Sequence, residues 1–546
     1  MNSYLLYKDT DYLTEAPYFD APCIIQDLGL RTLFMAAAKE VVYEEGLVKN
    51  VKKEDPFLLD TMKKIMMIPL QNGEQITYRQ EILKDCLKDE AFIRSLYALC
   101  SEILNRWKAL GRNVTDKYSQ RNPVASLLND LHVLHLFSWG LSEMKKLLEE
   151  HLPNLKSEGL RTLYERLCKE YPEELESYIQ KVLTDVSFYT EGLDEEKENL
   201  QPTVLKPHIV FGCSLEEGLK LSNLTLTEVS SVTKRFYKAG GTMDKIQEFK
   251  KSRIPDSFST SQRQAVSEQA GQLEFQMVSY VVSGLSPFMT AFNSFFDSLH
   301  RQSAFYLGAV NMIHQIKRFT PDYCFPRVCD RDCLRFEELR ELVMCMEQRV
   351  NAVGNTCRMD HKMLLIVTGA NQGGKSTFLR SIGIAQIMMQ CGLMVAANSY
   401  ESGIFPHFFT HFTRREDSEM NSGRLDEELR RMNQIIENLG DHALILLNES
   451  FATTTEKEGS VIAYDIIKAL NEAGVKILTV THLLSFARQV YSESQDNPES
   501  DVEFFCAERM ENGTRTFKMI QHAPLLTSFG LDLYEDIVEK NKTSNA

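Results

Sequence analysis

Features that mark secreted and membrane-spanning proteins are absent from this sequence. The 12 cysteines among 546 residues form no CxxC pair. The N-terminal segment carries Lys8, Asp9 and Asp11 where a signal peptide needs an unbroken apolar stretch. No apolar run reaches the roughly 18 residues that a transmembrane helix requires. We therefore predict an intracellular, cytoplasmic protein that needs no disulfides and does not enter a membrane.

An excess of positive charge is also lacking. The formal net charge is -15, which excludes a uniformly basic surface for nucleic acid but leaves room for a local basic patch. Hydrophobic residues make up 43% of the chain and charged residues 25%, as in ordinary globular proteins. The length suggests about three or four domains.

Helical periodicity dominates the first part of the chain. Apolar residues recur at spacings of three and four over residues 57–66 and again over 127–137. We interpret residues 1–200 as one helical core or lever region, which ends in the polar stretch 191–199. Residues 201–256 contain short runs rich in branched side chains, such as 209–211 and 224–232, and predict a small strand-containing insert.

Helical periodicity returns over residues 257–321, as in Tyr306, Val310 and Ile313. Residues 322–546 instead alternate short apolar runs with amphipathic stretches, which is typical of an α/β nucleotide-binding domain. The predicted fold class is therefore multidomain α and α/β: a long helical core or lever, a small clamp-like insert and a P-loop domain.

A phosphate-binding loop follows the apolar run 364–367. The segment 369–377 matches GxxxxGK[ST] and precedes a helical pattern, so backbone N–H groups and the helix N-terminus can converge on an anion. Lys375 is expected to reach the β and γ phosphates, and Ser376 to bind Mg²⁺. The residues expected to bind ATP are Gly369, Ala370, Asn371, Gln372, Gly373, Gly374, Lys375, Ser376 and Thr377.

Two further apolar runs deliver polar residues that suit ATP hydrolysis. The run 443–447 ends in Asn448 and Glu449; Asn448 offers an oxygen to Mg²⁺ together with Ser376, and Glu449 is the candidate to polarise the attacking water. The run 475–480 ends in Thr481 and His482, and His482 is the candidate γ-phosphate sensor. A solvated carboxylate and a structural histidine are the simpler alternatives.

Two weaker patterns concern DNA and metal. Seven basic residues gather between positions 234 and 253 and could neutralise phosphates, although a solvated charged surface explains them equally well. The candidate DNA-binding residues are Lys234, Arg235, Lys238, Lys245, Lys250, Lys251 and Arg253. Cys324, Cys329 and Cys333 do not have the spacing of a zinc site.

Together these motifs resemble the MutS family of DNA mismatch-repair ATPases, which are relatives of the ABC ATPases. The P-loop TGANQGGKST is close to the family's TG-x-N-x-GGKST. The segment 448–459, NESFATTTEKEG, is similar to DE-x-GRGT-[ST]-T-x-x-G, with Asn448 in place of Asp and residues 451–453 in place of Gly-Arg-Gly. Val480-Thr481-His482 resembles the family's ATH, residues 422–432 resemble a degenerate G-x-STFM-x-EM, and 527–531 resemble S-[FY]-G-[LI].

The resemblance implies a minimal family member that has a helical core, a clamp-like insert and the ATPase domain. Mismatch-reading, connector and nuclease-like domains are not expected. It further implies a homodimeric, Mg-dependent ATPase that clamps duplex or branched DNA, with Thr454 and Thr455 approaching the partner subunit's nucleotide. Two alternatives stay open: a weakly hydrolytic, nucleotide-gated scaffold with a protein partner, and an ABC-like ATPase of an unrelated complex. An ABC transporter subunit is disfavoured because an LSGGQ-type signature is absent.

Overall fold

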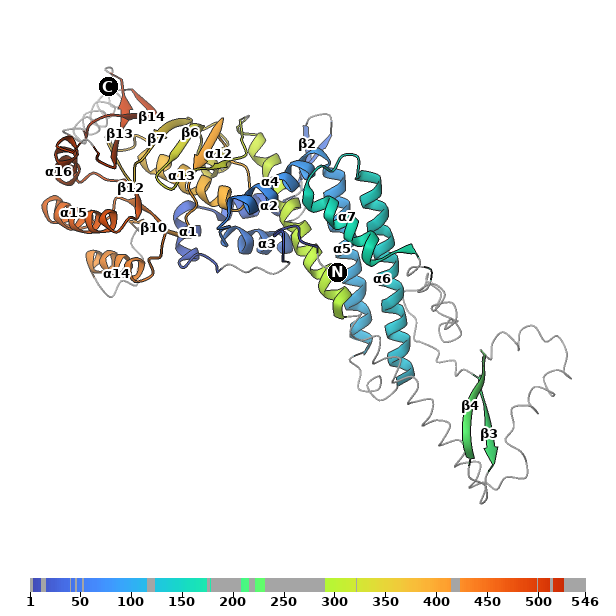
Figure 1. Ribbon diagram of the computed structural model, residues 1–546. Coiled ribbons are helices and arrows are strands. Elements are labelled where there is room, and N and C mark those ends of the chain that lie inside the picture. The colour runs from blue at the N-terminus through green and yellow to red at the C-terminus, as the bar shows by residue number, and fades with distance from the viewer. Residues whose placement is uncertain are drawn as a thin grey trace, which may run out of the picture. The chain divides into compact units, whose positions relative to one another are not determined.

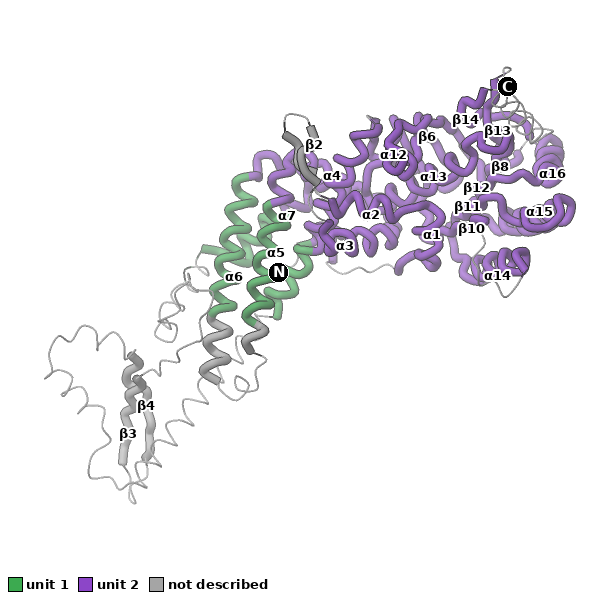
Figure 2. Tube along the Cα trace, turned by 180° about the vertical axis from the view of Figure 1, so that it is seen from behind, with its two compact units in different colours: residues 1–3, 95–150, 162–300 green, residues 4–94, 151–161, 301–546 purple. Residues whose placement is uncertain are grey.

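The computed structural model describes most of the chain as a mixture of helices and sheets (Figure 1). The described residues are 3–10, 16–39, 41–44, 47–51, 54–114, 123–173, 177, 208–215, 221–230, 290–320, 322–413, 423–497, 499–510 and 514–524. Two compact units are distinguished in Figure 2: residues 1–3, 95–150 and 162–300 form one, and residues 4–94, 151–161 and 301–546 form the other. Within these ranges, no helix combines the length and apolar character needed to cross a bilayer.

The first unit is built around long helices, as the apolar periodicity predicts. Its helices include most of α5 (Glu90–Val114) and α6 (Pro123–His151), together with part of α7 (Glu158–Glu170). Phe137 of α6 packs between aromatic rings, with centroid distances of 5.2 Å to Trp107 and 5.7 Å to Phe296. Burial of such rings on facing helices stabilises a helical bundle.

Two strands lie within residues 201–256, where the sequence predicts a strand-containing insert. Strands β3 (His208–Leu215) and β4 (Leu221–Ser230) pair antiparallel, with Ile209 opposite Val229. Branched and aromatic residues favour such pleated ladders, which is why the short apolar runs were informative.

One expectation for the N-terminal region is wrong. Residues 1–200 are not helical throughout, because β1 (Val41–Glu44) and β2 (Leu47–Val51) form an antiparallel hairpin. The β-branched Val41, Val42 and Val48 favour extended backbone here. Helices surround the hairpin in sequence: α1 (Ala21–Leu28), α2 (Arg31–Ala37), α3 (Pro56–Met66) and α4 (Gly73–Lys88).

The second unit contains a six-stranded sheet in the order β10-β11-β12-β8-β13-β14. The first five strands are parallel and β14 is antiparallel to β13. The strands are β8 (Leu364–Thr368), β10 (His407–Phe412), β11 (Ala443–Asn448), β12 (Lys476–Val480), β13 (Val502–Arg509) and β14 (Arg515–Gln521). The apolar runs predicted as strands coincide with β8, β11 and β12, because strands buried on both faces are apolar throughout.

Helices cover both faces of this sheet. The helices are α13 (Lys375–Gln390), α14 (Arg424–Glu437), α15 (Glu456–Glu472) and α16 (Leu484–Gln495). Alternate strand residues such as Ile445 and Ile477 form one core with side chains of α14, α15 and α16. Helix α13 packs on β11, β12 and α1, so the second face is also covered.

Helix α1 belongs with the P-loop sheet in the same compact unit. It packs on β10, where the Thr410 hydroxyl donates a hydrogen bond to Asp27 at 2.7 Å. The compact units therefore divide the chain differently from the four predicted segments. The division into residues 1–200, 201–256, 257–321 and 322–546 stays a prediction.

A smaller four-stranded sheet, in the order β5-β9-β6-β7, was not predicted. Its strands are β5 (Arg327–Val328), β6 (Leu334–Leu339), β7 (Asn355–Met359) and β9 (Ser399–Ser402). The short helix α12 (Leu342–Gln348) connects β6 toward β7. Strands this short carry little periodicity, and β9 joins the sheet from beyond the P-loop helix, so the sequence pattern gave no signal.

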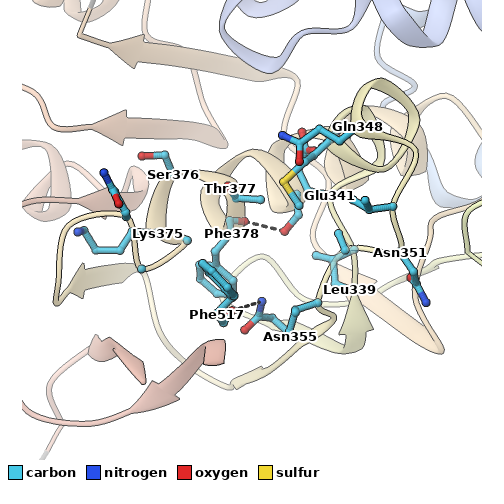
Figure 3. Close-up of a pocket in the computed structure, with 18 of the residues that line it drawn as sticks. Leu339, Glu341, Gln348, Asn351, Asn355, Lys375, Ser376, Thr377, Phe378 and Phe517 are labelled. Carbon is cyan, nitrogen blue, oxygen red and sulfur yellow. Dashed lines mark hydrogen bonds between the residues drawn. The ribbon is translucent and has the colours of Figure 1, made fainter. Parts of the chain in front are cut away.

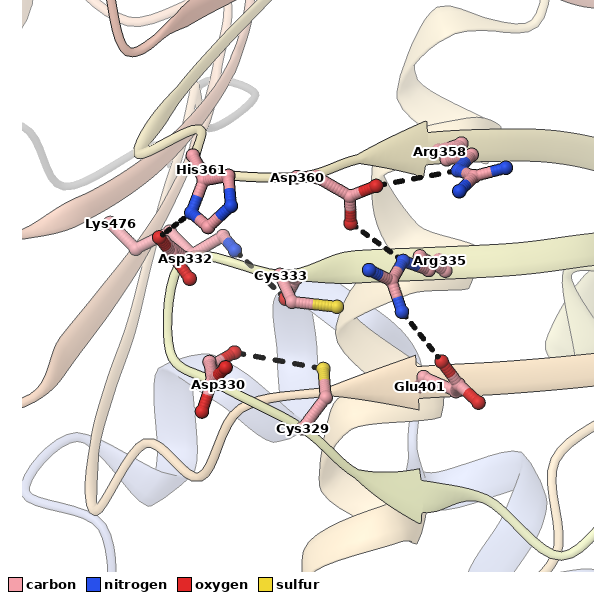
Figure 4. Close-up of polar contacts among 10 residues, drawn as sticks. All are labelled: Cys329, Asp330, Asp332, Cys333, Arg335, Arg358, Asp360, His361, Glu401 and Lys476. Carbon is pink, nitrogen blue, oxygen red and sulfur yellow. Dashed lines mark hydrogen bonds and ion pairs between the residues drawn. The ribbon is translucent and has the colours of Figure 1, made fainter.

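The loop that precedes β6 covers a buried lysine (Figure 4). Lys476, at the start of β12, is 1% exposed, and its ammonium donates hydrogen bonds to the carbonyl oxygens of Arg331 at 3.0 Å and Cys333 at 3.1 Å. Burial lowers the pKa of Lys476 to about 8, because the charged form loses its hydration. Lys476 thus connects the six-stranded sheet to the loop before the four-stranded sheet, and burial of its charge lowers the stability of the folded state.

We predict a pH-dependent stability from Lys476. The pKa falls from about 10.4 in the unfolded chain to about 8 in the folded one. Above pH 8 the folded state loses a proton that the unfolded state keeps, so the free energy of unfolding should rise up to about pH 10.4, by about 3 kcal/mol at most. Below pH 8 this contribution is constant.

The measurement is urea unfolding between pH 7 and 10 for the parental chain and Lys476→Met. As the pH rises, the free energy of unfolding of the parental chain should increase relative to that of Lys476→Met. Lys457→Met, at an exposed position of α15, is the control and should show no such trend. A difference between the parental chain and Lys476→Met that is independent of pH contradicts the assignment.

Candidate functional site

The P-loop connects β8 to α13 at the carboxyl edge of the six-stranded sheet. Gly369 has a φ of +119°, which L side chains rarely adopt. A Cβ atom at this position would lie 2.9 Å from the backbone nitrogen of Ala507 in β13. Glycine is therefore required here for two reasons, backbone conformation and the close approach of a neighbouring strand.

Lys375 is held inside this loop. Its side chain is buried, and its ammonium donates hydrogen bonds to the carbonyl oxygens of Gly369 and Ala370, both at 2.9 Å. Burial lowers the pKa of Lys375, and the Glu449 carboxylate opposes that shift. The positive charge is thus poorly hydrated, which favours capture of an anion such as a phosphate, whereas the nearby carboxylate competes with the anion for it.

The structure brings Ser376 and Asn448 together. The Ser376 hydroxyl donates a hydrogen bond of 2.8 Å to Asn448 Oδ1, at the end of β11. Magnesium binds oxygen ligands at about 2.0–2.1 Å in octahedral geometry, which places adjacent ligands about 2.9 Å apart. The separation of these two oxygens therefore suits a pair of neighbouring ligands of one Mg²⁺ ion.

Glu449 lines the same cavity as the P-loop residues. Its φ of +55° is left-handed, and its backbone N–H donates to Val480 O of β12 at 2.8 Å. Non-glycine residues in this region are uncommon and often mark functional sites. The carboxylate is therefore presented from a tight turn rather than from a solvated strand end.

His482 follows β12 at this edge of the sheet, and Val480 is paired with Val367 of β8. The residue is partly exposed, and the cavity lining comprises other side chains. The neighbouring Thr481 hydroxyl accepts a hydrogen bond from Leu483 N, which fixes the start of α16. The position suits the predicted sensor, but the structure does not bring His482 into the cavity.

Thr454 and Thr455 are engaged at the start of α15. Thr455 is the N-cap and accepts a hydrogen bond from Glu458 N at 3.4 Å, while the Thr454 hydroxyl donates to the Glu458 carboxylate at 2.6 Å. Such capping stabilises a helix terminus. A contact with a partner's nucleotide, as the sequence suggested, requires the hydroxyls to exchange these bonds and stays a prediction.

The cavity has a second, mainly apolar side that sequence reasoning missed (Figure 3). Its volume is about 490 Å³, within the range of small-molecule sites. Apolar and amide side chains from outside the P-loop contribute to the lining: Leu339, Met344, Gln348, Val350, Asn351, Val353, Asn355 and Phe517. An apolar wall beside a phosphate loop is suited to a nucleobase and its sugar.

Phe517 is fixed at the edge of this wall. It has a φ of +59° and is 47% exposed, which is unusual for a large aromatic residue in a strand. The Asn355 amide donates to Phe517 O at 3.3 Å and accepts from Met519 N at 2.7 Å. An exposed ring held by its backbone is available to stack on a base. The sequence did not indicate this role for Phe517, because aromatic residues are common in strands.

The cysteines considered for zinc are not arranged as a metal site. Burial raises the pKa of the Cys329 thiol, and the neighbouring Cys333 adds to the shift, which opposes the thiolate that zinc needs; the Cys329 thiol donates instead to the Asp330 carbonyl oxygen (Figure 4). In the part of the chain that the structure describes, no group of three or more His, Cys, Asp or Glu side chains is placed to hold a metal ion.

Several predicted features lie outside the described residues. They include the polar boundary 191–199 and the segment 527–531. The same holds for the candidate DNA-binding residues Lys234, Arg235, Lys238, Lys245, Lys250, Lys251 and Arg253. Of the degenerate motif at 422–432, residues from Gly423 onward are described and form the start of α14.

The fold and the site define a P-loop α/β protein, and sequence comparisons place it more narrowly. A family model described as the MutS2 N-terminal domain matches residues 71–319, and one described as MutS domain V matches residues 365–539. These matches, together with the relatives described next, support the MutS family for this chain.

Three curated relatives illustrate the similarity. Endonuclease MutS2 of Ruminiclostridium cellulolyticum is 29% identical over 33% of this chain and 23% of its own length. Endonuclease MutS2 of Thermus thermophilus is 32% identical over 24% of this chain and 18% of its length. DNA mismatch repair protein MutS of Macrococcus caseolyticus is 29% identical over 29% of this chain and 19% of its length. The matched segments thus span less than a quarter of each relative.

We predict that Lys375→Met weakens ATP binding by about 10-fold to 100-fold, because hydrogen bonds to charged groups contribute about 1.5–3 kcal/mol. Methionine keeps the apolar stem, so the fold should persist. Titration calorimetry measures the affinity, and thermal unfolding checks the fold. Lys362→Met, just before the opposite end of β8, is the control and should bind ATP as the parental chain does. Unchanged affinity in Lys375→Met contradicts the phosphate site.

Proposed function

We propose that this chain is a Mg-dependent ATPase of the MutS kind that clamps DNA in a nucleotide-dependent manner. The observation that carries the proposal is the meeting of Lys375, Ser376, Asn448 and Glu449 at one edge of the sheet. An anion-binding loop, a pair of oxygen ligands and a carboxylate are the parts that phosphoryl transfer to water requires.

The proposed roles follow from the side chains. Backbone N–H groups of residues 369–374 bind the phosphates, and Lys375 exchanges its carbonyl partners for phosphate oxygens. Ser376 and Asn448 hold Mg²⁺, which neutralises charge on the β and γ phosphates when it is bound. Glu449 orients the attacking water and accepts its proton. His482 contacts the γ phosphate if the end of β12 moves toward the cavity.

The DNA-binding part of the proposal is supported by the names of the relatives and by the basic segment. One relative is named a DNA mismatch repair protein. The seven basic residues between 234 and 253 would neutralise phosphates without contacting base edges. A homodimer, with Thr454 and Thr455 facing the partner's nucleotide, and the minimal domain organisation belong to the same proposal.

A nucleotide-gated scaffold with slow hydrolysis is the second candidate, and the neutral Asn448 favours it. An amide supplies an oxygen but no charge to Mg²⁺. Asn448→Asp should lower the Mg²⁺ concentration for half-maximal hydrolysis in the ATPase. If both the parental chain and Asn448→Asp bind ATP and neither hydrolyses it in a single-turnover assay, the scaffold is the better description.

For the ATPase, Glu449→Gln should reduce single-turnover hydrolysis by about 100-fold or more, the usual effect of losing a general base. ATP affinity should change little, because the amide remains small and polar. The measurement combines rapid quench with equilibrium ATP binding. Glu472→Gln, exposed at the end of α15, is the control. Hydrolysis at the parental rate in Glu449→Gln means that another group activates the water.

For DNA binding, we expect a steep loss of affinity with salt and discrimination between matched and mismatched duplexes below about 1 kcal/mol, less than one base contact contributes. The double variant Lys250→Glu, Lys251→Glu should weaken all duplexes alike and flatten the salt dependence. The double variant Lys63→Glu, Lys64→Glu on α3 is the charge-matched control. A tenfold preference for a G·T duplex at two salt concentrations contradicts sequence-independent binding.

A further inference from the structure

The turn after β11, residues Glu449 to Phe451, has an unusual backbone. Glu449 and Phe451 both have left-handed φ values, +55° and +63°, on either side of Ser450. Two such residues persist only where neighbouring contacts hold them. Phe451 is fully buried, and a Cβ atom at Gly459 of α15 would lie 2.4 Å from Phe451 O, so the helix backbone comes very close to the turn.

Ser450 is bound to the neighbouring strand β10. Its hydroxyl lies 2.7 Å from His411 Nδ1 and 2.9 Å from His411 O. The other ring nitrogen, Nε2, lies 3.0 Å from the carbonyl oxygen of Glu428 in α14. Since a carbonyl only accepts, Nε2 carries a proton, and the fully buried ring links the turn to α14.

The side chain of Glu428 makes a second link from α14 to the turn. Its carboxylate accepts a hydrogen bond from Phe451 N at 2.9 Å. Phe451 in turn stacks on His411, with ring centroids 5.7 Å apart. Helix α14 and strand β10 therefore contact the turn through both of the residues that follow Glu449.

Glu428 is a costly residue for this position. It is 6% exposed, and burial raises its pKa, although the Phe451 N–H favours the ionised form. An apolar residue at this position of α14 would be buried without the loss of hydration that a carboxylate suffers. It would, however, leave the Phe451 N–H without this acceptor. The Glu428 carboxylate, by accepting this hydrogen bond, favours one defined conformation of the turn.

We propose that Glu428, His411 and Ser450 are positioning residues, which hold the turn so that Glu449 faces the P-loop cavity. The proposal rests on the proposed function, since Glu449 is placed there as the group that activates water. None of the three lines the cavity, so they act through the backbone of residues 449–451. Helix α14 then determines how far Glu449 reaches toward the nucleotide.

Two measurements on the full chain test the proposal: hydrogen exchange of residues 449–453, and single-turnover ATP hydrolysis beside ATP affinity. Glu428→Ala and Ser450→Ala should each speed exchange in the turn and slow hydrolysis by about 10-fold to 100-fold, the effect of misplacing a catalytic group. ATP affinity and exchange at residues 369–377 should stay parental.

The conservative variant Glu428→Gln keeps an acceptor for Phe451 N and should retain parental exchange and hydrolysis. Glu427→Ala, the adjacent carboxylate on α14, is the matched control. The proposal is overturned if exchange in the turn is unchanged in Glu428→Ala, or if the turn loosens while hydrolysis stays parental. It is also overturned if ATP affinity and thermal stability fall in proportion to hydrolysis, which indicates a general structural role.

Failure of the proposed function has a different signature. If the parental chain does not hydrolyse ATP, the assignment of an ATPase is wrong for every variant alike. Hydrogen exchange still decides whether Glu428 and Ser450 hold the turn: faster exchange in Glu428→Ala and Ser450→Ala supports their positioning role, and unchanged exchange removes it.

Discussion

The parallel order β11-β12-β8 is the constraint on which the site depends. Because these strands run in the same direction, their carboxyl ends meet at one edge of the sheet. The P-loop leaves β8 there, and Asn448 ends β11 there, which allows the 2.8 Å hydrogen bond between Ser376 and Asn448. In an antiparallel order the two side chains would lie at opposite edges, and no shared metal or phosphate site could form.

Phe451 and Asn448 depart from the family's motif, and each makes contacts with neighbouring residues. Phe451 stands where the motif has glycine, and its left-handed φ costs about 1–2 kcal/mol for a residue with a Cβ atom. Complete burial of the ring, its stacking on His411 and the hydrogen bond to Glu428 offset that cost. Asn448 is different, because its amide keeps the contact with Ser376 while removing a negative charge. The first departure concerns conformation and the second concerns the metal.

The sequence predicted the parts of the site that are local. A P-loop is defined by eight consecutive residues, and buried parallel strands are apolar runs, so β8, β11, β12 and the residues at their ends could be placed. The hairpin at 41–51 was missed because helical patterns on both sides masked a short branched stretch. The second wall of the cavity was missed because it joins residues such as Val350 and Phe517, which are far apart in the chain. No periodicity links them, and only the tertiary packing does.

We propose that the cavity between the P-loop and Phe517 binds a nucleotide across both walls. Hydrogen exchange of the full chain with and without MgATP tests it most directly. We expect slower exchange in two separate segments, residues 369–377 and residues 515–519, because phosphates bind one wall and the base packs on the other. Unchanged exchange in both segments, with MgATP in excess, means that no nucleotide binds in this cavity.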